Sequence, residues 1–308
     1  MTEFPFCINA DETCGDLEST IAWLRNSKAT LLEQLQNHGV VLLRGFPLHD
    51  ANAFDACVSA IDLQNFSYAE SLSNAVRHNR TERVFTANEA PADVEIFLHH
   101  EMAQTPIYPS TLFFFCEQAS AGGGATLLCQ SDRLISLLEA EASDFVADLE
   151  SKGVRYTNIM PAAADLDSGQ GRSWQDTLGV SNKEAAEARL RKLGYCWEWQ
   201  KGQSLKVTTP VLPAVRKLGN GSKSFFNQLI AAYKGWKDSR NDGRKVIQFG
   251  DDTAIADELM ERVCSLAEDI TFDHYWENGD LAIVDNFQIM HGRRPYQGQR
   301  KILASLAQ

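Results

Sequence analysis

The chain has 308 residues, of which 44% are hydrophobic and 23% are charged, a composition typical of folded globular proteins and not of disordered or fibrous ones. Its formal net charge is −12, from 41 acidic and 29 basic residues, which argues against a nucleic-acid partner because such binding needs clustered basic residues. The seven cysteines are scattered and include no CxxC pair. They predict reduced thiols and argue against a disulfide framework or a thiolate zinc site.

The N-terminal residues and the hydropathy of the chain give no sign of export or membrane insertion. Residues 1–11 lack a basic stretch followed by an apolar run, and no segment reaches the roughly 18 apolar residues that a membrane span needs. We therefore expect a cytoplasmic protein without a membrane partner. The sequence leaves the oligomeric state open, including a homo-oligomer.

The first hundred residues predict helices and strands separated by a long loop. Apolar residues recur at helical spacing up to His38-Gly39, which ends the pattern as a helix C-terminus does. The β-branched and apolar run that follows is typical of a strand buried on both faces. The expected elements are helices at 17–38 and 51–63, strands at 40–43 and 94–98, and mostly loop over 64–96.

The rest of the chain predicts further strands, with helices clustered midway. The aromatic run 111–116, the glycines Gly122 to Gly124 and the apolar run 125–128 predict two strands joined by a glycine turn. The other expected elements are helices at 131–152, 181–193 and 253–268, an exposed loop at 161–171, and strands at 206–209, 224–226, 281–285 and 302–306.

These elements predict a mainly β fold with peripheral helices, of the α+β class, because strands and helices do not alternate as they do in βαβ proteins. No change in composition marks a linker, so we expect a single domain over residues 1–308. We also expect a helical and loop insertion at about 131–205, between the two halves of the candidate site described next.

Three residues form a candidate metal site. Because side chains alternate along an extended segment, His99 and Glu101 project to the same side at the end of an apolar run, while His100 projects away. His291, just past the run 281–285, is the best candidate for a third ligand. Two histidines and one carboxylate leave three positions of an octahedral metal open, as in iron(II) oxygenases. The same set also suits a hydrolytic zinc enzyme, or histidines buried without a metal.

Beyond this spacing, five segments resemble the signature segments of the taurine dioxygenase and clavaminate synthase-like family of iron(II)- and 2-oxoglutarate-dependent oxygenases. They stand in the family's order and at its approximate separations, from the first strand-like run to the C-terminal one. The segments are Gly39 to Phe46, His99 to Met102, Gly122 to Thr126, His291 to Pro295 and Arg300 to Leu303. The resemblance implies a double-stranded β-helix, or cupin-like jelly roll, as the core.

The resemblance also implies roles for individual residues. His99, Glu101 and His291 match the iron ligands, with glutamate where many relatives have aspartate. Thr126 matches the threonine that hydrogen-bonds the 2-oxoglutarate carboxylate, and Arg300 matches the arginine that pairs with it. A guanidinium grips a carboxylate through two parallel hydrogen bonds, which a lysine does not provide. Lys301 follows directly, so a shift of one residue would exchange the two positions.

Other polar residues have two interpretations each. Arg293 and Arg294 either contact substrate or 2-oxoglutarate, or form a surface arginine pair. Asn227 either binds substrate or caps a turn. We expect His100 to be structural and Phe113 to Phe115 to belong to the core.

The expected activity follows from the resemblance. Fe(II), 2-oxoglutarate and O₂ would oxidise a C–H bond of a small molecule, with release of succinate and CO₂. Hydroxylation is the expected outcome, and desaturation or cyclisation stays open. Glu101 disfavours halogenation, because halogenating relatives have a small residue there that lets chloride bind. The alternatives are a zinc-dependent hydrolase and a catalytically inactive binding protein.

The substrate itself is less well defined by the sequence. By family analogy we expect an amino acid or a natural-product intermediate. Its determinants are expected in the loops at 64–92 and 157–174 and in the helical insert from Ser181, because connecting segments carry specificity.

Overall fold

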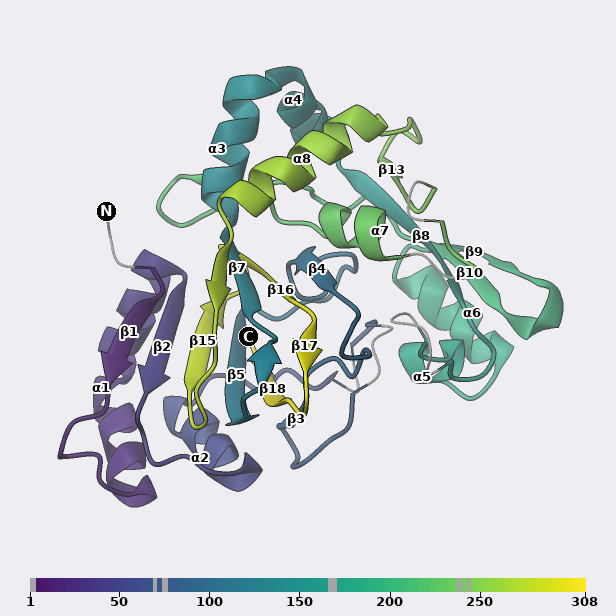
Figure 1. The fold of residues 1–308 in the computed structure, drawn as a ribbon. Helices are drawn as coiled ribbons and strands as arrows, with labels where there is room; N and C mark the ends of the chain where they lie inside the picture. Colours follow the sequence, from purple (N-terminus) through teal and green to yellow (C-terminus); the bar gives the residue numbers. More distant parts are fainter. Residues whose placement is uncertain (1–3, 69–70, 74–76, 166–170, 237–239, 243–244) are drawn as a thin grey trace.

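Two β-sheets form the centre of the molecule in the computed structural model, and helices lie around them (Figure 1). The structure describes residues 4–68, 71–73, 77–165, 171–236, 240–242 and 245–308. The named strands pair antiparallel, except that β1 (Phe6–Asn9) runs parallel to β2 (Val40–Arg44). The expected α+β class is confirmed. No helix in these ranges is long and apolar enough to cross a membrane.

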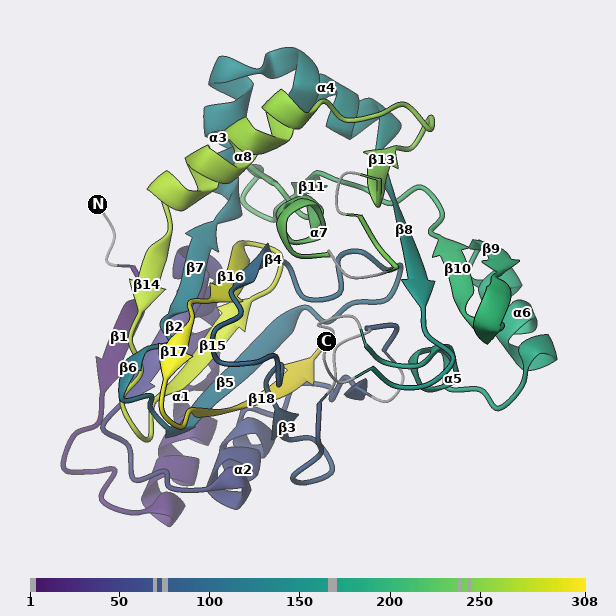
Figure 2. The ribbon, with the colours of Figure 1, turned by 45° about the vertical axis from the view of Figure 1, so that its right-hand side comes forward.

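The larger central sheet has six strands and is covered on one face by helices. Its order is β1, β2, β15 (Leu281–Asp285), β5 (Thr111–Gln118), β18 (Lys301–Ala307) and β3 (Phe85–Thr86). The helices α1 (Leu17–His38) and α2 (Ala51–Ile61) pack on its outer face (Figure 2). Because side chains alternate along β5, Phe113 and Phe115 pack under these helices, whereas Phe114 faces the smaller sheet.

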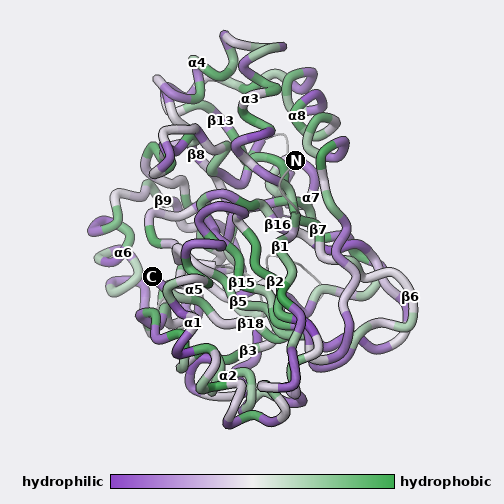
Figure 3. Tube along the Cα trace, turned by 90° about the vertical axis from the view of Figure 1, so that its left-hand side faces the viewer, coloured by the Kyte–Doolittle hydropathy of each residue, from purple (hydrophilic) through white to green (hydrophobic). Residues whose placement is uncertain are grey.

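Apolar residues concentrate in these central strands. Figure 3 shows β2 and β5 in green at the middle of the molecule, with the polar segments mostly at its periphery. The helix α1 begins and ends where the sequence predicts. The Asp16 carboxylate accepts the N–H of Ser19 at 2.8 Å, and Gly39 has a φ of 75°, the left-handed conformation in which glycine commonly ends a helix.

The smaller central sheet carries the candidate ligands. Its order is β14 (Phe272–His274), β7 (Thr126–Gln130), β16 (Ile289–Arg293) and β4 (Ile96–His99). Its residues Leu127 and Met290 pack outward under the helices, while Leu128 and Ile289 face the larger sheet. By the same alternation, every second residue of β7 and β16 faces the space between the sheets.

A third sheet lies beside this core, and its strands come from the part of the sequence between β7 and β14. Its order is β13 (Ile247–Phe249), β8 (Val154–Met160), β10 (Leu205–Thr208) and β9 (Cys196–Trp199). Since β10 and β13 pair with β8, the unit extends beyond the insertion end expected at residue 205. Its helices are α3 (Ser131–Glu141), α4 (Ser143–Lys152), α5 (Trp174–Leu178), α6 (Lys183–Lys192), α7 (Leu229–Gly235) and α8 (Asp257–Asp269).

One expectation for this region needs correction, and another falls partly outside the described residues. The helix expected over 131–152 is two helices, α3 and α4, which meet at Ala142 without a glycine or proline to mark the break. Residues 166–170 of the loop expected at 161–171 lie outside the described residues. The remaining short elements are a 3₁₀ turn at Lys201–Gln203 and the strand pairs β6 (Gly122–Gly123) with β17 (Tyr296–Gln297) and β11 (Arg216–Lys217) with β12 (Lys223–Ser224).

Candidate active site

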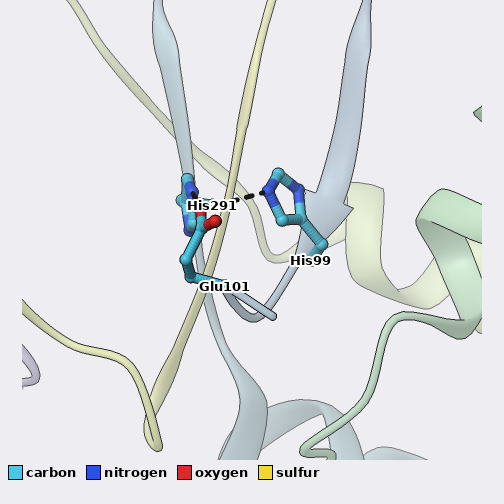
Figure 4. Close-up of side chains that lie close together, drawn as sticks. All are labelled: His99, Glu101 and His291. Atoms are coloured by element: carbon cyan, nitrogen blue, oxygen red, sulfur yellow. Dashed lines mark ion pairs between the residues drawn. The ribbon is translucent and has the colours of Figure 1, made fainter. Parts of the chain in front are cut away.

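The three predicted metal ligands come together between the two central sheets (Figure 4). His99 ends β4, His291 lies directly opposite it on β16, and Glu101 lies in the turn after β4. Their ligand atoms all lie within 4.8 Å of one another. Oε2 of Glu101 is 3.5 Å from Nε2 of His291 and 3.9 Å from Nε2 of His99. Opposed residues of antiparallel strands bring their side chains together, so the strand register creates the histidine pair.

The two imidazoles are suited to bind a metal. Burial, helped by the neighbouring His291, lowers the pKa of His99 to about 4, so this ring is neutral near pH 7. Its Nδ1 donates to the carbonyl oxygen of Phe97 at 2.8 Å, which leaves the lone pair of Nε2 facing the cluster. Nδ1 of His291 is buried and has no hydrogen-bond partner among the described residues.

The carboxylate of Glu101 is held in its ionised form. Burial by itself would raise its pKa, but the Arg77 guanidinium, with a hydrogen bond from His291, outweighs burial and lowers the pKa. The neutral imidazole of His99, the imidazole of His291 and the ionised carboxylate, all within reach of one point, are a donor set that fits a divalent metal such as Fe(II).

Arg300 and Thr126 lie against each other at the same cavity. Nη2 of Arg300 donates to Oγ1 of Thr126 at 3.2 Å, and its Nε donates to the carbonyl oxygen of Gly124 at 3.0 Å. Lys301 is exposed at the start of β18 and lines no part of the cavity. Of the two registers that the sequence leaves open, the structure therefore has the arginine facing inward. Burial, with Arg293 nearby, lowers the pKa of Arg300 to about 10, which leaves it protonated near pH 7.

The glycine turn permits this close approach. Gly123 and Gly124 have φ values of 67° and 72°, in the left-handed region. A Cβ on Gly124 would lie 2.9 Å from Cβ of Tyr296 and 3.1 Å from Cδ of Arg300. Gly124 thus has a physical cause in this turn, since a larger residue would push the arginine away from the threonine.

One cavity of about 300 Å³ joins both halves of this site. Its lining from the polar stretch 64–96 includes Ser73, Asn88 and Pro91, in the region where the sequence predicts substrate determinants. The opposite wall comes from α7 and Trp236, which the sequence does not single out. In the described parts of 157–174 and in 181–193, no residue lines the cavity.

Arg293 reaches the cavity but its hydrogen bonds are made elsewhere. Nη1 donates to the carbonyl oxygen of Ala90, and Nη2 donates to those of Pro91 and Val94. It therefore fixes the loop that forms one wall, and a contact with substrate stays a prediction. The neighbouring Arg294 instead forms ion pairs away from the ligands, with Glu95, Glu268 and Asp273.

The expectation that Asn227 binds substrate needs correction. Its side chain is buried outside the cavity, donating to the carbonyl oxygen of Ala214 and accepting the N–H of Leu229 at the start of α7. The amide closes a local turn just before α7, the turn-capping alternative that the sequence leaves open. The adjacent Gln228 lines the cavity in its place and donates to the carbonyl oxygen of His100.

Two buried residues fix the turn that carries Glu101. The ring nitrogens of His100 contact the carbonyl oxygen of Asn286 and the hydroxyl of Ser131, which confirms a structural role. The Asn286 side chain accepts the N–H of Glu101 and donates to the carbonyl oxygens of Glu101 and Pro109. The sequence offers only a weak sign of Asn286, a polar residue between two buried runs.

Two further site residues carry no sequence signal. Arg77 lies in the weakly patterned stretch 64–96, yet its Nη2 is 3.0 Å from both carboxylate oxygens of Glu101. Trp276 follows β14, and its Nε1 donates to Oγ1 of Thr126 at 2.8 Å. Both are far from their partners in sequence, so only the fold brings them to the site.

The combination of two facing sheets with a buried cluster of two histidines and a glutamate is that of a mononuclear metal-dependent enzyme. The model of the family described as "Taurine catabolism dioxygenase TauD, TfdA family" matches residues 2–306. The chain belongs to this family, and it is a dioxygenase that uses Fe(II), 2-oxoglutarate and O₂.

Individual relatives agree with this assignment. A clavaminate synthase-like protein of Arabidopsis thaliana is 35% identical over 284 residues, covering 92% of this chain and 86% of the relative. The dapdiamide synthesis protein DdaC of Enterobacter agglomerans is 27% identical over 287 residues, covering 89% and 83%. The structure of an asparagine oxygenase, solved with Fe(II), 3-hydroxyasparagine and succinate, has a TM-score of 0.61 at 12% identity, covering 98% of this chain and 93% of that one.

Proposed function

We propose that this protein oxidises an unactivated C–H bond of a small molecule, with His99, Glu101 and His291 as the Fe(II) ligands. The observation that carries the proposal is that this cluster and the Arg300 and Thr126 pair line one cavity. A carboxylate-binding arginine beside a three-residue metal site suits a dicarboxylate co-substrate that reaches both.

The residues around the co-substrate act by binding and orientation. The guanidinium of Arg300 is protonated and half-buried, and it would pair with the distal carboxylate of 2-oxoglutarate. Thr126 Oγ1 already accepts hydrogen bonds from Arg300 and Trp276, so its own proton is free to be donated to that carboxylate. The low exposure of Glu101 and His291 keeps bulk water from the ligands. Fe(II), when bound with 2-oxoglutarate and O₂, supplies the oxidant for the C–H bond, with succinate and CO₂ as co-products.

The fold proposal follows the same line. We propose that the two facing sheets are the two halves of a double-stranded β-helix, with the unit between β7 and β14 inserted in it. The mostly antiparallel pairing and the shared apolar cluster between the sheets support this. We further propose that residues 1–308 form a single domain.

The substrate proposed is an amino acid or a natural-product intermediate. The cavity volume suits a small molecule, and Ile96, Phe97, Phe114 and Trp236 give it apolar walls. The proposal is supported by one relative that is named for dapdiamide synthesis and by one structural neighbour that is named as an asparagine oxygenase. Because Glu101 keeps a carboxylate in the ligand set, hydroxylation is favoured over halogenation, with desaturation and cyclisation as further outcomes.

The test is binding and turnover with defined components. Metal-free protein given Fe(II) and 2-oxoglutarate without O₂ is expected to develop a weak visible charge-transfer band. With O₂ it is expected to release succinate. A screen of amino acids and biosynthetic intermediates should identify the substrate as the compound that speeds this release. Absence of 2-oxoglutarate binding would overturn the proposal. Tightly bound zinc with hydrolytic activity would revive the zinc hydrolase alternative, which family membership already argues against.

A further inference from the structure

Arg77 is the one cationic side chain among the described residues that contacts a candidate metal ligand directly. Its Nη2 lies 3.0 Å from Oε1 and 3.0 Å from Oε2 of Glu101, so a single nitrogen bridges both oxygens. The two side chains are 7% and 5% exposed. The ion pair is therefore enclosed, and removing either partner would leave a buried charge.

Aromatic rings hold the guanidinium in this position. Its central carbon lies 4.7 Å from the ring centroid of Tyr68 and 5.3 Å from that of Phe85, whose strand belongs to the larger sheet. A guanidinium stacks on aromatic faces, and this fixes its plane without using its hydrogen-bond donors. Arg77 is thus anchored to the sheet opposite the one that carries the histidines.

The placement matters because a carboxylate can bind a metal through one oxygen or through both. A glutamate ligand that used both oxygens would occupy one more coordination position. This site needs its open positions, since 2-oxoglutarate and O₂ must bind the same ion. Oε2 is the oxygen that faces Nε2 of both histidines, at 3.5 and 3.9 Å, so it is the oxygen placed to bind the metal, while Arg77 would compete with the metal for Oε1.

From this geometry we infer that Arg77 is a positioning residue that keeps one oxygen of Glu101 engaged, so that Glu101 offers the metal a single oxygen and the remaining positions stay open for 2-oxoglutarate. The inference rests on the proposed assignment of Glu101 as a ligand. It goes beyond that assignment because it predicts how strongly the loaded site binds its co-substrate.

The test separates metal binding from co-substrate binding in the absence of turnover. Arg77→Met removes the donor and the charge, while Arg77→Lys keeps the charge on a shorter, flexible stem. Mn(II) is titrated into metal-free protein, and 2-oxoglutarate is titrated into the Fe(II) form without O₂ by its visible charge-transfer band. We expect Arg77→Met to bind Mn(II) at least as tightly as the wild type does. It should bind 2-oxoglutarate about tenfold more weakly, because the loss of a hydrogen bond to a charged group has an effect of about this size on an affinity. Arg77→Lys should lie between the two.

Arg80→Met is the matched control. Arg80 lies in the same segment and pairs with Glu117 at 3.1 Å, but it lines no part of the cavity, so both affinities should equal those of the wild type. Unchanged 2-oxoglutarate affinity in Arg77→Met, or weakened Mn(II) binding, would overturn the inference. If Arg77→Met does not fold, wild-type affinity for 2-oxoglutarate in folded Arg77→Lys would overturn it equally. A wild-type protein that binds no 2-oxoglutarate would instead overturn the proposed function.

Discussion

The indole Nε1 of Trp276 donates a hydrogen bond to Oγ1 of Thr126 at 2.8 Å. The same oxygen accepts Nη2 of Arg300, so both of its lone pairs are used and its proton is directed elsewhere. The ring of His274 meets the indole edge to face at 4.5 Å and holds it in place. The orientation of the Thr126 hydroxyl is therefore set in part by Trp276, in the segment after β14, and by His274 on β14.

Trp276→Phe should weaken 2-oxoglutarate binding while sparing the metal. The phenyl ring keeps most of the packing, but Thr126 loses a donor and its hydroxyl is free to rotate. The expected loss is about 1 kcal/mol, or a rise of the KM for 2-oxoglutarate by about fivefold. Steady-state kinetics of succinate release check it, with Trp23→Phe as the control, since Trp23 lies on α1, packs against Phe46 and lines no part of the cavity. An unchanged KM would show that the indole does not orient Thr126.

Arg300→Lys should have a much larger effect than Lys301→Ala. The lysine keeps a charge but cannot donate to the carboxylate, Thr126 and Gly124 together, so we expect the KM for 2-oxoglutarate to rise by about 10- to 100-fold. Lys301 is exposed, and its removal should leave the KM within about twofold of the wild type. The reverse ranking would place Lys301 at the co-substrate and contradict the register of the structure.

Gly124→Ala should destabilise the protein, whereas Gly122→Ala should not. An alanine at φ 72° costs about 1–2 kcal/mol, and its Cβ would also crowd Tyr296 and Arg300. A Cβ on Gly122 would meet only Oε1 of Gln297, at 3.9 Å. Urea unfolding of both variants measures the difference in the free energy of unfolding. Equal midpoints for the two variants would contradict the role of Gly124 in the turn.

The metal-free protein should lose stability as the pH falls from about 6.5 towards 4. Burial, with Arg44 and Arg300 nearby and despite Asp280, lowers the pKa of His274 to about 4. As the pH falls, His274 is therefore protonated in the unfolded chain before it is protonated in the folded one. The stability that comes from keeping His274 neutral is complete above pH 6.5, and up to about 3 kcal/mol of the free energy of unfolding is lost below it.

The variant His274→Phe tests this pH dependence, because it keeps a ring against Trp276 but does not titrate. Its free energy of unfolding, measured by urea from pH 7 to 4.5, should fall less steeply than that of the wild type. Metal-free protein is used because metal binding itself depends on pH. Parallel curves for the two proteins would contradict a buried neutral His274.

Local patterns were enough to predict much of this protein. Helical periodicity and the His38-Gly39 stop predicted α1, and the run of apolar residues predicted β2, because these signals reside in neighbouring residues. The alternation of His99 and Glu101, with His291, predicted a cluster that the structure brings together. Family resemblance then supplied Thr126 and Arg300, which spacing by itself does not reveal.

Long-range pairing decided the rest. Whether Arg300 or Lys301 faces the cavity depends on where β18 begins. The extent of the third sheet depends on the pairing of β10 and β13 with β8. Which of the two interpretations of Asn227 holds depends on its partners, Ala214 and Leu229, whose positions are set by the fold around α7. Arg77 and Trp276 belong to the site only because the chain returns to it, over 24 and 150 residues, to meet Glu101 and Thr126. The sequence by itself determined the chemistry of the ligands, and the tertiary structure decided which side chains hold them in place.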